Sequence, residues 1–226
     1  MTDPPVVLSI QVGTPQQMGA AGAADPLDQP WSSGFFKGPV VGSLRLGRTN
    51  LAGDGQADLR NHGGPDKAVL AYAAGHYPAW RQELERPDLP HGAFGENFTV
   101  AGLDEGSVCI GDTYQLGQAR VQVSQPRQPC WKLGRRWRME DLPGRVLATG
   151  RSGWYLRVLL EGTVEPGVAM VLVERPFPEW TVARVTAVMR RRQGDPATAA
   201  SLAACPLLSV DWRRTLSADE LGANRV

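Results

Sequence analysis

"ENFTVAGLDEGSVCIGDTYQLGQARVQVSQP", residues 96–126, is the part of this sequence that most clearly predicts a fold class. Apolar and polar residues alternate in three runs, "ENFTVAGL", "SVCIGDTYQLG" and "ARVQVSQP", which are separated by turns rich in Gly and Asp. Alternation with a period of two is typical of half-buried β-strands. We therefore predict three consecutive strands here, with Cys109 inside the second.

Similar runs lie on both sides of this stretch. Strand-like segments are "VVLSIQV" (6–12), "KAVLAY" (67–72), "GWYLRVLLEGTVEPG" (153–167) and "AMVLVERP" (169–176). The spacing of Val41, Leu44 and Leu46 indicates two more short strands. Residues 13–34 show no period and predict a surface excursion, while residues 76–84 predict one short helix. Many short strands with few helices between them favour a mainly β fold, a closed or nearly closed β-barrel, over residues 1–175.

The pattern changes after residue 175, and residues 176–226 predict a small C-terminal three-helix unit. Val182, Val185 and Met189 share one helical face, and Asp195 followed by Pro196 is a helix start with an N-cap. A further helix is expected to open at Ser209, and "SADE" (217–220) fits a capping box. Because this unit is too short to bury much core alone, we expect it to dock on the barrel.

Composition limits the function classes. The 226 residues carry a formal net charge of +1, so no overall charge points to nucleic acid or to an anionic membrane. Three cysteines far apart, with no CxxC pair, argue against a disulfide framework or a structural zinc site. The sequence has no signal-peptide pattern and no apolar run of about 20 residues, so a soluble, cytoplasmic protein is predicted.

One cysteine stands in an unusual setting, "SQPRQPCWKL" (124–133). Pro126 and Pro129 stiffen the backbone that leads to Cys130, and Arg127 and Lys132 place positive charge on either side of it. A stiff backbone and two cations suit the presentation of a thiolate. The alternative is a buried cysteine at a strand end, which for an arbitrary cysteine is the commoner case. Cys109 and Cys205 are expected to be inert packing thiols.

A second candidate segment is "GDGQADLRNHGGPDKAV" (53–69). Its glycines can bring backbone N–H groups close to an anion, and Arg60 and Lys67 could complete such a cradle with charge. A hydrophilic turn with an ordinary surface ion pair is the equal alternative. The segment at 53–69 lacks the GxxxxGK[ST] pattern of a P-loop.

A third segment is "GAFGENFTV" (92–100), where Glu96 and Asn97 could point into a barrel mouth or simply cap a turn. We expect His76 and His91 to lie at the surface, and the arginine runs 135–138 and 190–192 to be solvated, although the first run follows Cys130 so closely that it could help bind an anionic ligand. No HExxH or GxSxG motif supports a metallohydrolase or a serine hydrolase.

These segments, in this order, resemble MOSC-domain proteins, the family named for the C-terminal domain of molybdenum cofactor sulfurase. Within the family the chain is similar to the stand-alone bacterial YiiM-type proteins, which add a small three-helix domain that "PEWTVARV" (178–185) resembles. The matching segments are "GDGQADLRNHGGPDKAV", "GAFGENFTV", "VCIGDTYQLG" and "QVSQPRQPCWKLGRRW". The loop at 14–34 matches nothing in the family, and "GRRWRMEDLPGRV" is similar only in outline.

The resemblance implies a β-barrel that binds the molybdenum cofactor, with no pyridoxal phosphate, and that reduces N-hydroxylated compounds such as 6-hydroxylaminopurine to amines, a detoxification. Cys130 would be the molybdenum ligand. Other residues with an implied catalytic role are Asp66, Glu96 and Asn97. Residues implied to bind the cofactor are Arg60, His62, Gly63, Gly64, Lys67, Gln125, Arg127 and Lys132.

The implied partners are an external electron-donor reductase and a small N-hydroxylated substrate, without nucleic acid or membrane, and a homodimer is left open. Two rival readings use the same cysteine. One is a molybdenum cofactor or sulfur carrier without reductase turnover. The other is a cofactor-free thiol enzyme in which His62 is the base for Cys130. A scaffold without chemistry ranks last, because it leaves the Arg–Cys–Lys spacing unexplained.

Overall fold

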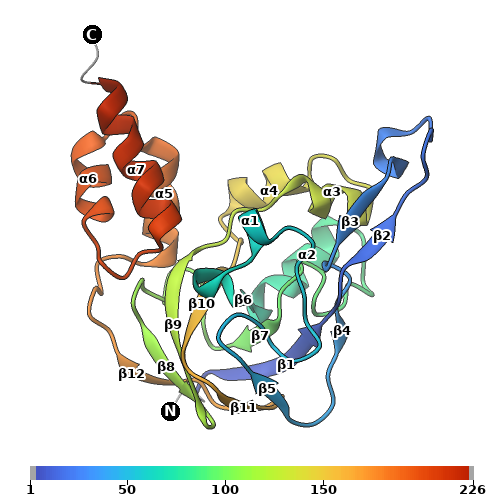
Figure 1. Cartoon of the computed structure of the whole chain (residues 1–226), viewed down its shortest axis with the longest axis horizontal. Coiled ribbons are helices and arrows are strands. Elements are labelled where there is room, and N and C mark those ends of the chain that lie inside the picture. The colour runs from blue at the N-terminus through green and yellow to red at the C-terminus, as the bar shows by residue number, and fades with distance from the viewer. Residues whose placement is uncertain (1–3, 224–226) are drawn as a thin grey trace.

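The structure, a computed structural model, describes residues 4–223. Its main element is one curled eight-stranded sheet in which all neighbouring strands run antiparallel except β6 and β7 (Figure 1). In spatial order the strands are β12 (Val171–Glu174), β8 (Thr113–Leu116), β9 (Ala119–Pro126), β10 (Trp154–Leu160), β6 (Val69–Ala73), β7 (Phe98–Ala101), β1 (Val6–Val12) and β4 (Gly38–Pro39).

The curled sheet nearly closes on itself. Val7 N donates to Val168 O at 3.0 Å, and Met170 N donates to Pro5 O at 2.8 Å. These bonds bring the segment before β12 against the start of β1, although the two strands lie at opposite ends of the sheet order. The predicted mainly β, barrel-like fold is confirmed as a curled half-barrel with several short helices.

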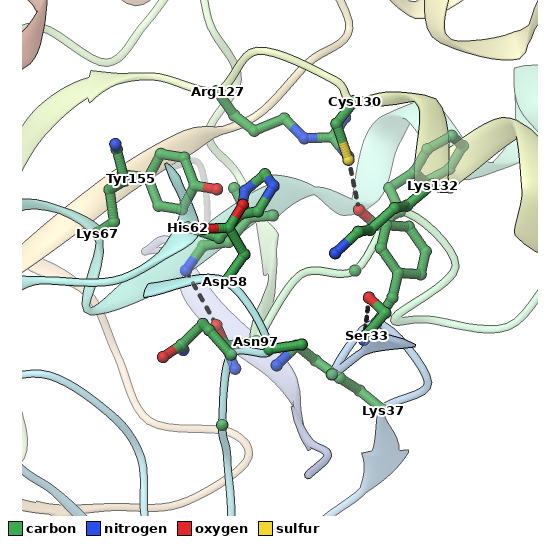
Figure 2. Close-up of a pocket in the computed structure, with 18 of the residues that line it drawn as sticks. Ser33, Lys37, Asp58, His62, Lys67, Asn97, Arg127, Cys130, Lys132 and Tyr155 are labelled. Carbon is green, nitrogen blue, oxygen red and sulfur yellow. Dashed lines mark hydrogen bonds between the residues drawn. The ribbon is translucent and has the colours of Figure 1, made fainter. Parts of the chain in front are cut away.

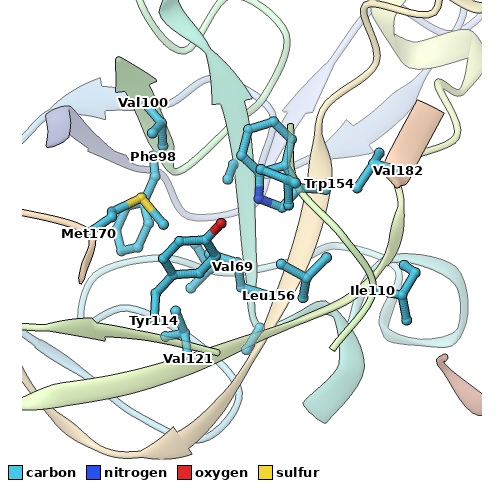
Figure 3. Packing of buried hydrophobic residues seen from close by; sticks show 14 of the residues in the cluster. Val69, Phe98, Val100, Ile110, Tyr114, Val121, Trp154, Leu156, Met170 and Val182 are labelled. Atoms are coloured by element: carbon cyan, nitrogen blue, oxygen red, sulfur yellow. The ribbon is translucent and has the colours of Figure 1, made fainter. Parts of the chain in front are cut away.

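The barrel interior is apolar because its strands alternate. In β10, Trp154, Leu156 and Val158 are buried, whereas Tyr155 and Arg157 between them are only partly buried. Side chains from the other strands pack against this row inside the sheet (Figure 3). A side chain in this position contributes about 1.5–3 kcal/mol relative to an exposed one.

A layer of short helices and their loops forms a second core beside the sheet. It includes α2 (Tyr77–Glu83), α3 (Trp131–Trp137) and α4 (Leu142–Thr149). Tyr72 on β6 stacks on Phe94 with ring centroids 4.6 Å apart, and Trp80 Nε1 donates to Tyr72 Oη at 2.6 Å. The cluster fixes the loop before β7 in place, which matters because this loop lines the cavity described below.

Residues 13–34 form more than a surface excursion. They contain a hairpin of β2 (Gln16–Met18) and β3 (Trp31–Ser33), with a short turn η1 (Pro26–Asp28) at its tip. The hairpin projects from the barrel beside α3 (Figure 1). Sequence periodicity missed these strands because each has only three residues.

The hairpin is held by arginines that the sequence predicted to be solvated. Arg135 donates to the carbonyl oxygens of Gln29 and Pro26 at 2.9 and 2.7 Å, and Arg138 pairs with carboxylates of the same tip. Arg136 lies over the Phe35 ring and donates to the Phe35 carbonyl at 2.5 Å. The expectation of a solvated face is therefore wrong for Arg135 and Arg136, because planar guanidinium groups stack and donate in parallel, whereas Arg138 is exposed as expected.

The remaining short elements lie between the sheet strands. They are β5 (Leu44–Leu46), α1 (Leu59–His62), η2 (Pro65–Lys67), η3 (Ala74–His76) and β11 (Gly162–Val164), which pairs with β5. Two local predictions fail. Cys109 lies outside any strand and makes an isolated bridge with Thr181, although it is buried as expected, and Val41 is almost fully exposed between β4 and β5.

The C-terminal unit has three helices, α5 (Val182–Arg191), α6 (Pro196–Ala203) and α7 (Val210–Ala223). Asp195 caps α6 through Thr198 N at 3.1 Å, as the sequence predicts. The prediction that "SADE" caps the start of a helix is wrong, because residues 217–220 continue α7.

The predicted docking of this unit on the barrel is confirmed. Val182, Val185, Leu202 and Trp212 belong to the same buried cluster as the barrel interior, so the helices share the core of the sheet. In the part of the chain that the structure describes, no helix is long and apolar enough to cross a membrane.

Candidate functional site

A pocket that is open to solvent lies at one end of the sheet, with about 640 Å³ of empty space when the adjoining open solvent is included (Figure 2). Segments far apart in sequence line it, among them the exit of the hairpin, the loop at 55–58, the loop before β7 and the segment after β9, and further lining residues are His62, Lys67, Leu70 and Tyr155. Close backbone approach brings two of them together, because a Cβ on Gly34 would lie 2.0 Å from Gly55 O. A glycine at position 34 is therefore part of how the cavity is built.

Cys130 lies in this cavity, at the start of α3. Its side chain is free and half-buried, whereas Cys109 and Cys205 are buried. The backbone before it is anchored to the residue that precedes β10, since Arg127 N donates to Gly153 O at 3.0 Å. The stiff segment predicted from the prolines thus presents the one partly accessible thiol among the three cysteines.

Arg127 has an unusual environment for a cation. Its side chain is buried, with 4% exposed, and Nη2 donates to Phe94 O at 3.1 Å. Nη1 is buried and has no hydrogen-bond partner in the described chain. The guanidinium extends toward Cys130 at the cavity wall (Figure 2). A buried donor without a partner costs about 1–3 kcal/mol, so this group is suited to an anionic ligand.

Three lysines also line the cavity, and each has a protein partner. Lys132 Nζ donates to Ser32 O at 2.9 Å, and Lys67 Nζ lies 3.0 Å from Asp211 Oδ2. Lys37 pairs with Asp54. Together with Arg127 they make the cavity a basic one, although the chain as a whole is nearly neutral.

Lys37 and Asp54 form a nearly buried pair that the sequence did not single out. Burial lowers the pKa of Lys37, and the Asp54 charge acts in the opposite direction. Asn97 Nδ2 donates to Asp54 Oδ2 at 2.9 Å, and Asn97 Oδ1 accepts from Leu70 N at 3.1 Å. Asn97 therefore lines the cavity, as predicted, while its amide is used to hold Asp54 and β6.

His62 and Tyr155 line the cavity as neutral groups. Burial is the main cause that lowers the pKa of His62, and nearby Lys132 lowers it further. Burial raises the pKa of Tyr155, so its phenol keeps its proton. The Tyr155 hydroxyl points toward His62 and Asp58 in Figure 2. Strand alternation could have placed Tyr155 opposite the buried row of β10, but nothing in the sequence linked it to Cys130.

Several predicted site residues lie elsewhere. Glu96 is fully buried and accepts from Gly92 N, Phe94 N and Thr99 Oγ1 at 2.7, 3.1 and 3.0 Å, and from the Tyr77 hydroxyl. It does not line the cavity, and its implied catalytic role stays a prediction. Its carboxylate instead fixes the loop before β7.

Asp66 also faces away from the cavity. Its Oδ1 accepts from Arg157 Nε at 2.8 Å and its Oδ2 from Val210 N at 3.3 Å. Gln125 is buried in β9, with Nε2 donating to Pro126 O at 3.3 Å. The predicted site residues that do not line the cavity are Asp66, Glu96, Arg60, Gly63, Gly64 and Gln125.

The predicted residues that the fold does bring together are Cys130, Arg127, Lys132, Lys67, His62 and Asn97. In the described residues, no group of three or more His, Cys, Asp or Glu side chains is placed to hold a metal ion. The Cys130 thiol is thus the soft donor that this basic cavity offers.

Comparison with known proteins places the chain. Residues 58–171 match the MOSC domain, and residues 180–218 match the YiiM-like 3-alpha helix domain. Protein YiiM of Escherichia coli (strain K12) is 37% identical over 186 residues, which cover 81% of this chain and 83% of that protein. The chain belongs to the MOSC-domain family.

Further proteins are similar to most of this chain. The uncharacterized protein YflK of Bacillus subtilis (strain 168) is 50% identical over 169 residues, 75% of this chain and 73% of that protein. The crystal structure of YiiM from Geobacillus stearothermophilus superposes with a TM-score of 0.79 at 36% identity, covering 96% and 99% of the two chains. A protein of Gibberella moniliformis named "Reductase" is 40% identical over 164 residues, 71% of this chain but only 29% of that longer protein.

Most of the cavity belongs to the matched MOSC region, since Cys130, Arg127 and His62 lie within residues 58–171. Ser33 and Lys37 come from the segment before it, at the exit of the hairpin. Gly55, Gln56 and Ala57 also precede the matched region, so the hairpin exit and this loop give the cavity of this MOSC protein walls that the family match does not cover.

Proposed function

We propose that this chain is a molybdenum-cofactor-binding oxidoreductase that reduces N-hydroxylated compounds, such as 6-hydroxylaminopurine, to amines. The observation that carries the proposal is the buried Arg127 Nη1, which lacks a partner in a cavity that also contains the Cys130 thiol. MOSC membership and a longer relative named "Reductase" support the same class of chemistry.

The residues present fit the cofactor. Cys130 supplies a soft thiolate donor, which is the ligand type suited to a thiophilic metal. The unpaired Arg127 donor, with Lys132 and His62 nearby, fits an anionic phosphate or an acceptor edge of a pterin. When bound, the cofactor would supply the two-electron redox chemistry that no side chain in the cavity offers.

The chain's own residues bind and orient. Phe35, Phe94 and Leu70 give the cavity apolar walls that suit a flat heteroaromatic ring and restrict water. The protonated Tyr155 hydroxyl can donate a hydrogen bond to a substrate oxygen. Reduction of an N–OH group to an amine consumes two electrons and two protons and releases water.

The electrons would come from an external reductase, because the sequence carries no flavin or NAD fingerprint. A reduced thiol at Cys130 suits the cytoplasm, and we propose that compartment.

The test is molybdenum content followed by turnover. Wild type and Cys130→Ser are purified from a host that makes the cofactor, and molybdenum is measured by elemental analysis. We expect metal in wild type, loss of it in the variant, and reduction of 6-hydroxylaminopurine by the loaded wild type with a chemical electron donor. Metal without turnover would instead support a cofactor carrier, and absence of metal from both proteins would overturn the proposal.

A further inference from the structure

The Lys67 side chain joins the cavity to the C-terminal helices. It lines the cavity, yet its Nζ lies 3.0 Å from Asp211 Oδ2 in the first turn of α7. The Lys67 side chain is 11% exposed and that of Asp211 61%. Figure 2 shows Lys67 on the far side of the group from Lys132 and Lys37, with its ammonium turned away from them. A cation at the cavity edge is thus neutralised by a carboxylate from another unit.

The start of α7 is fastened to the turn that carries Lys67. Asp66 Oδ2 accepts from Val210 N at 3.3 Å, directly beside Asp211. Ser209 N donates to Ser124 O at 2.9 Å, and Ser124 Oγ donates to Asp66 O at 2.6 Å. Ser124, near the end of β9, thus holds both η2 and Ser209, the residue before α7. Three hydrogen bonds that involve backbone groups therefore fix the start of α7, which carries Asp211, beside the turn that carries Lys67.

We propose that Asp211 is a positioning residue that keeps the Lys67 ammonium at the cavity edge and so sets how strongly the cavity attracts anionic groups. A lysine has a flexible four-carbon stem and a compact charge, so its ammonium can reach a different place once its partner is removed. The inference rests on the proposed function only in taking the cavity to receive an anionic group. The C-terminal unit then tunes the cavity as well as bracing the barrel.

Alkylation of Cys130 measures this directly, because the thiol lies in the same cavity and the other two cysteines are buried. The probes are iodoacetate, which is anionic, and iodoacetamide, which is neutral, applied to the full-length protein without cofactor. The ratio of the two rate constants reports the cavity potential and cancels changes in thiol access. Cys130→Ser identifies the site of labelling.

We expect Asp211→Asn to raise the iodoacetate-to-iodoacetamide ratio roughly threefold, as one unit of charge at intermediate dielectric would. The same substitution in a Lys67→Met background should raise it clearly less, because no ammonium is then released. Asp211→Glu should restore the wild-type ratio. Glu161→Gln, which breaks the exposed Arg45–Glu161 pair outside the cavity, is the matched control and should leave the ratio unchanged.

Equal increases in the Lys67 and Lys67→Met backgrounds would overturn the inference, because they would show only the distant field of a lost carboxylate. An unchanged ratio in Asp211→Asn would overturn it as well. Neither result depends on molybdenum. Loss of the proposed function, seen as wild type without metal, is therefore read separately from failure of this inference.

Discussion

The Lys37 ammonium and the Asp54 carboxylate form an ion pair that is almost entirely removed from solvent, with 7% and 0% of the two side chains exposed. The pair joins the exit of the β2–β3 hairpin to the loop at 55–58, and Gly13 N donates to Asp54 at 3.0 Å. It therefore ties together two cavity walls that are distant in sequence.

Asp54→Asn should lower the free energy of unfolding by about 3 kcal/mol, because it leaves a buried lysine charge without its partner. Since Asp54 raises the already lowered pKa of Lys37, that pKa should fall further in the variant. Urea denaturation measures the change. The double variant Lys37→Met with Asp54→Asn is the control and should be more stable than Asp54→Asn alone; a single variant as stable as wild type would contradict the prediction.

Arg127→Met should abolish cofactor retention while changing stability little. The wild-type side chain makes one hydrogen bond and leaves Nη1 unpaired, so a flexible apolar replacement of similar length removes a desolvation cost together with that bond. We expect the free energy of unfolding to stay within about 1 kcal/mol of wild type. Arg127→Lys keeps the charge but not the planar fork, and intermediate retention is expected. A strongly destabilised Arg127→Met protein with normal metal content would refute the assignment.

Glu96→Gln tests a residue that the sequence placed in catalysis and the structure places in the loop. The carboxylate accepts from four donors, and an amide would turn two of its own hydrogens toward them. The free energy of unfolding should fall by about 2 kcal/mol, as measured by thermal or urea denaturation. The rate of Cys130 alkylation by iodoacetamide should change little. Normal stability with turnover reduced a hundredfold or more would instead restore the catalytic role.

Stability should fall as the pH drops from 7 to 5, and His62 should contribute to the fall. Burial lowers the pKa of His62 in the folded chain, so the unfolded chain takes up the proton first. Because the unfolded state binds more protons below about pH 6.5, the free energy of unfolding decreases as the pH falls toward the folded pKa.

His62→Gln should reduce this slope in urea denaturation series at fixed ionic strength. The pKa of His91 is also lowered by burial, so His91→Gln is the matched comparison and should reduce the slope as well. The lowered pKa of Asp58 acts only at more acidic pH, below its ordinary value of 3.8. An unchanged slope in His62→Gln would show that the histidine is not protected from protonation.

Sequence alone determined what depends on local pattern. The alternation in β10 and β9 predicted strands, and the Asp195–Pro196 pair predicted the start of α6, because side-chain direction and N-capping involve residues only a few positions apart. The setting of Cys130 between prolines and cations also singled out the thiol that proved to be partly accessible. The same logic failed at residues 217–220, where a local capping pattern lies inside the longer helix α7.

Only the tertiary structure decided which polar groups meet at the cavity. Glu96 and Asn97 are neighbours, yet one is buried against Tyr77 and the other lines the cavity, because adjacent residues at a strand entry point to opposite sides. The Lys37–Asp54 and Lys67–Asp211 pairs join residues 17 and 144 positions apart, and no local pattern encodes such partners. The Lys37–Asp54 pair forms because folding removes both charges from water, and a buried charge must then find a counter-ion wherever the fold brings one. The Lys67–Asp211 pair forms because α7 lies against the turn that carries Lys67, and its carboxylate stays largely exposed.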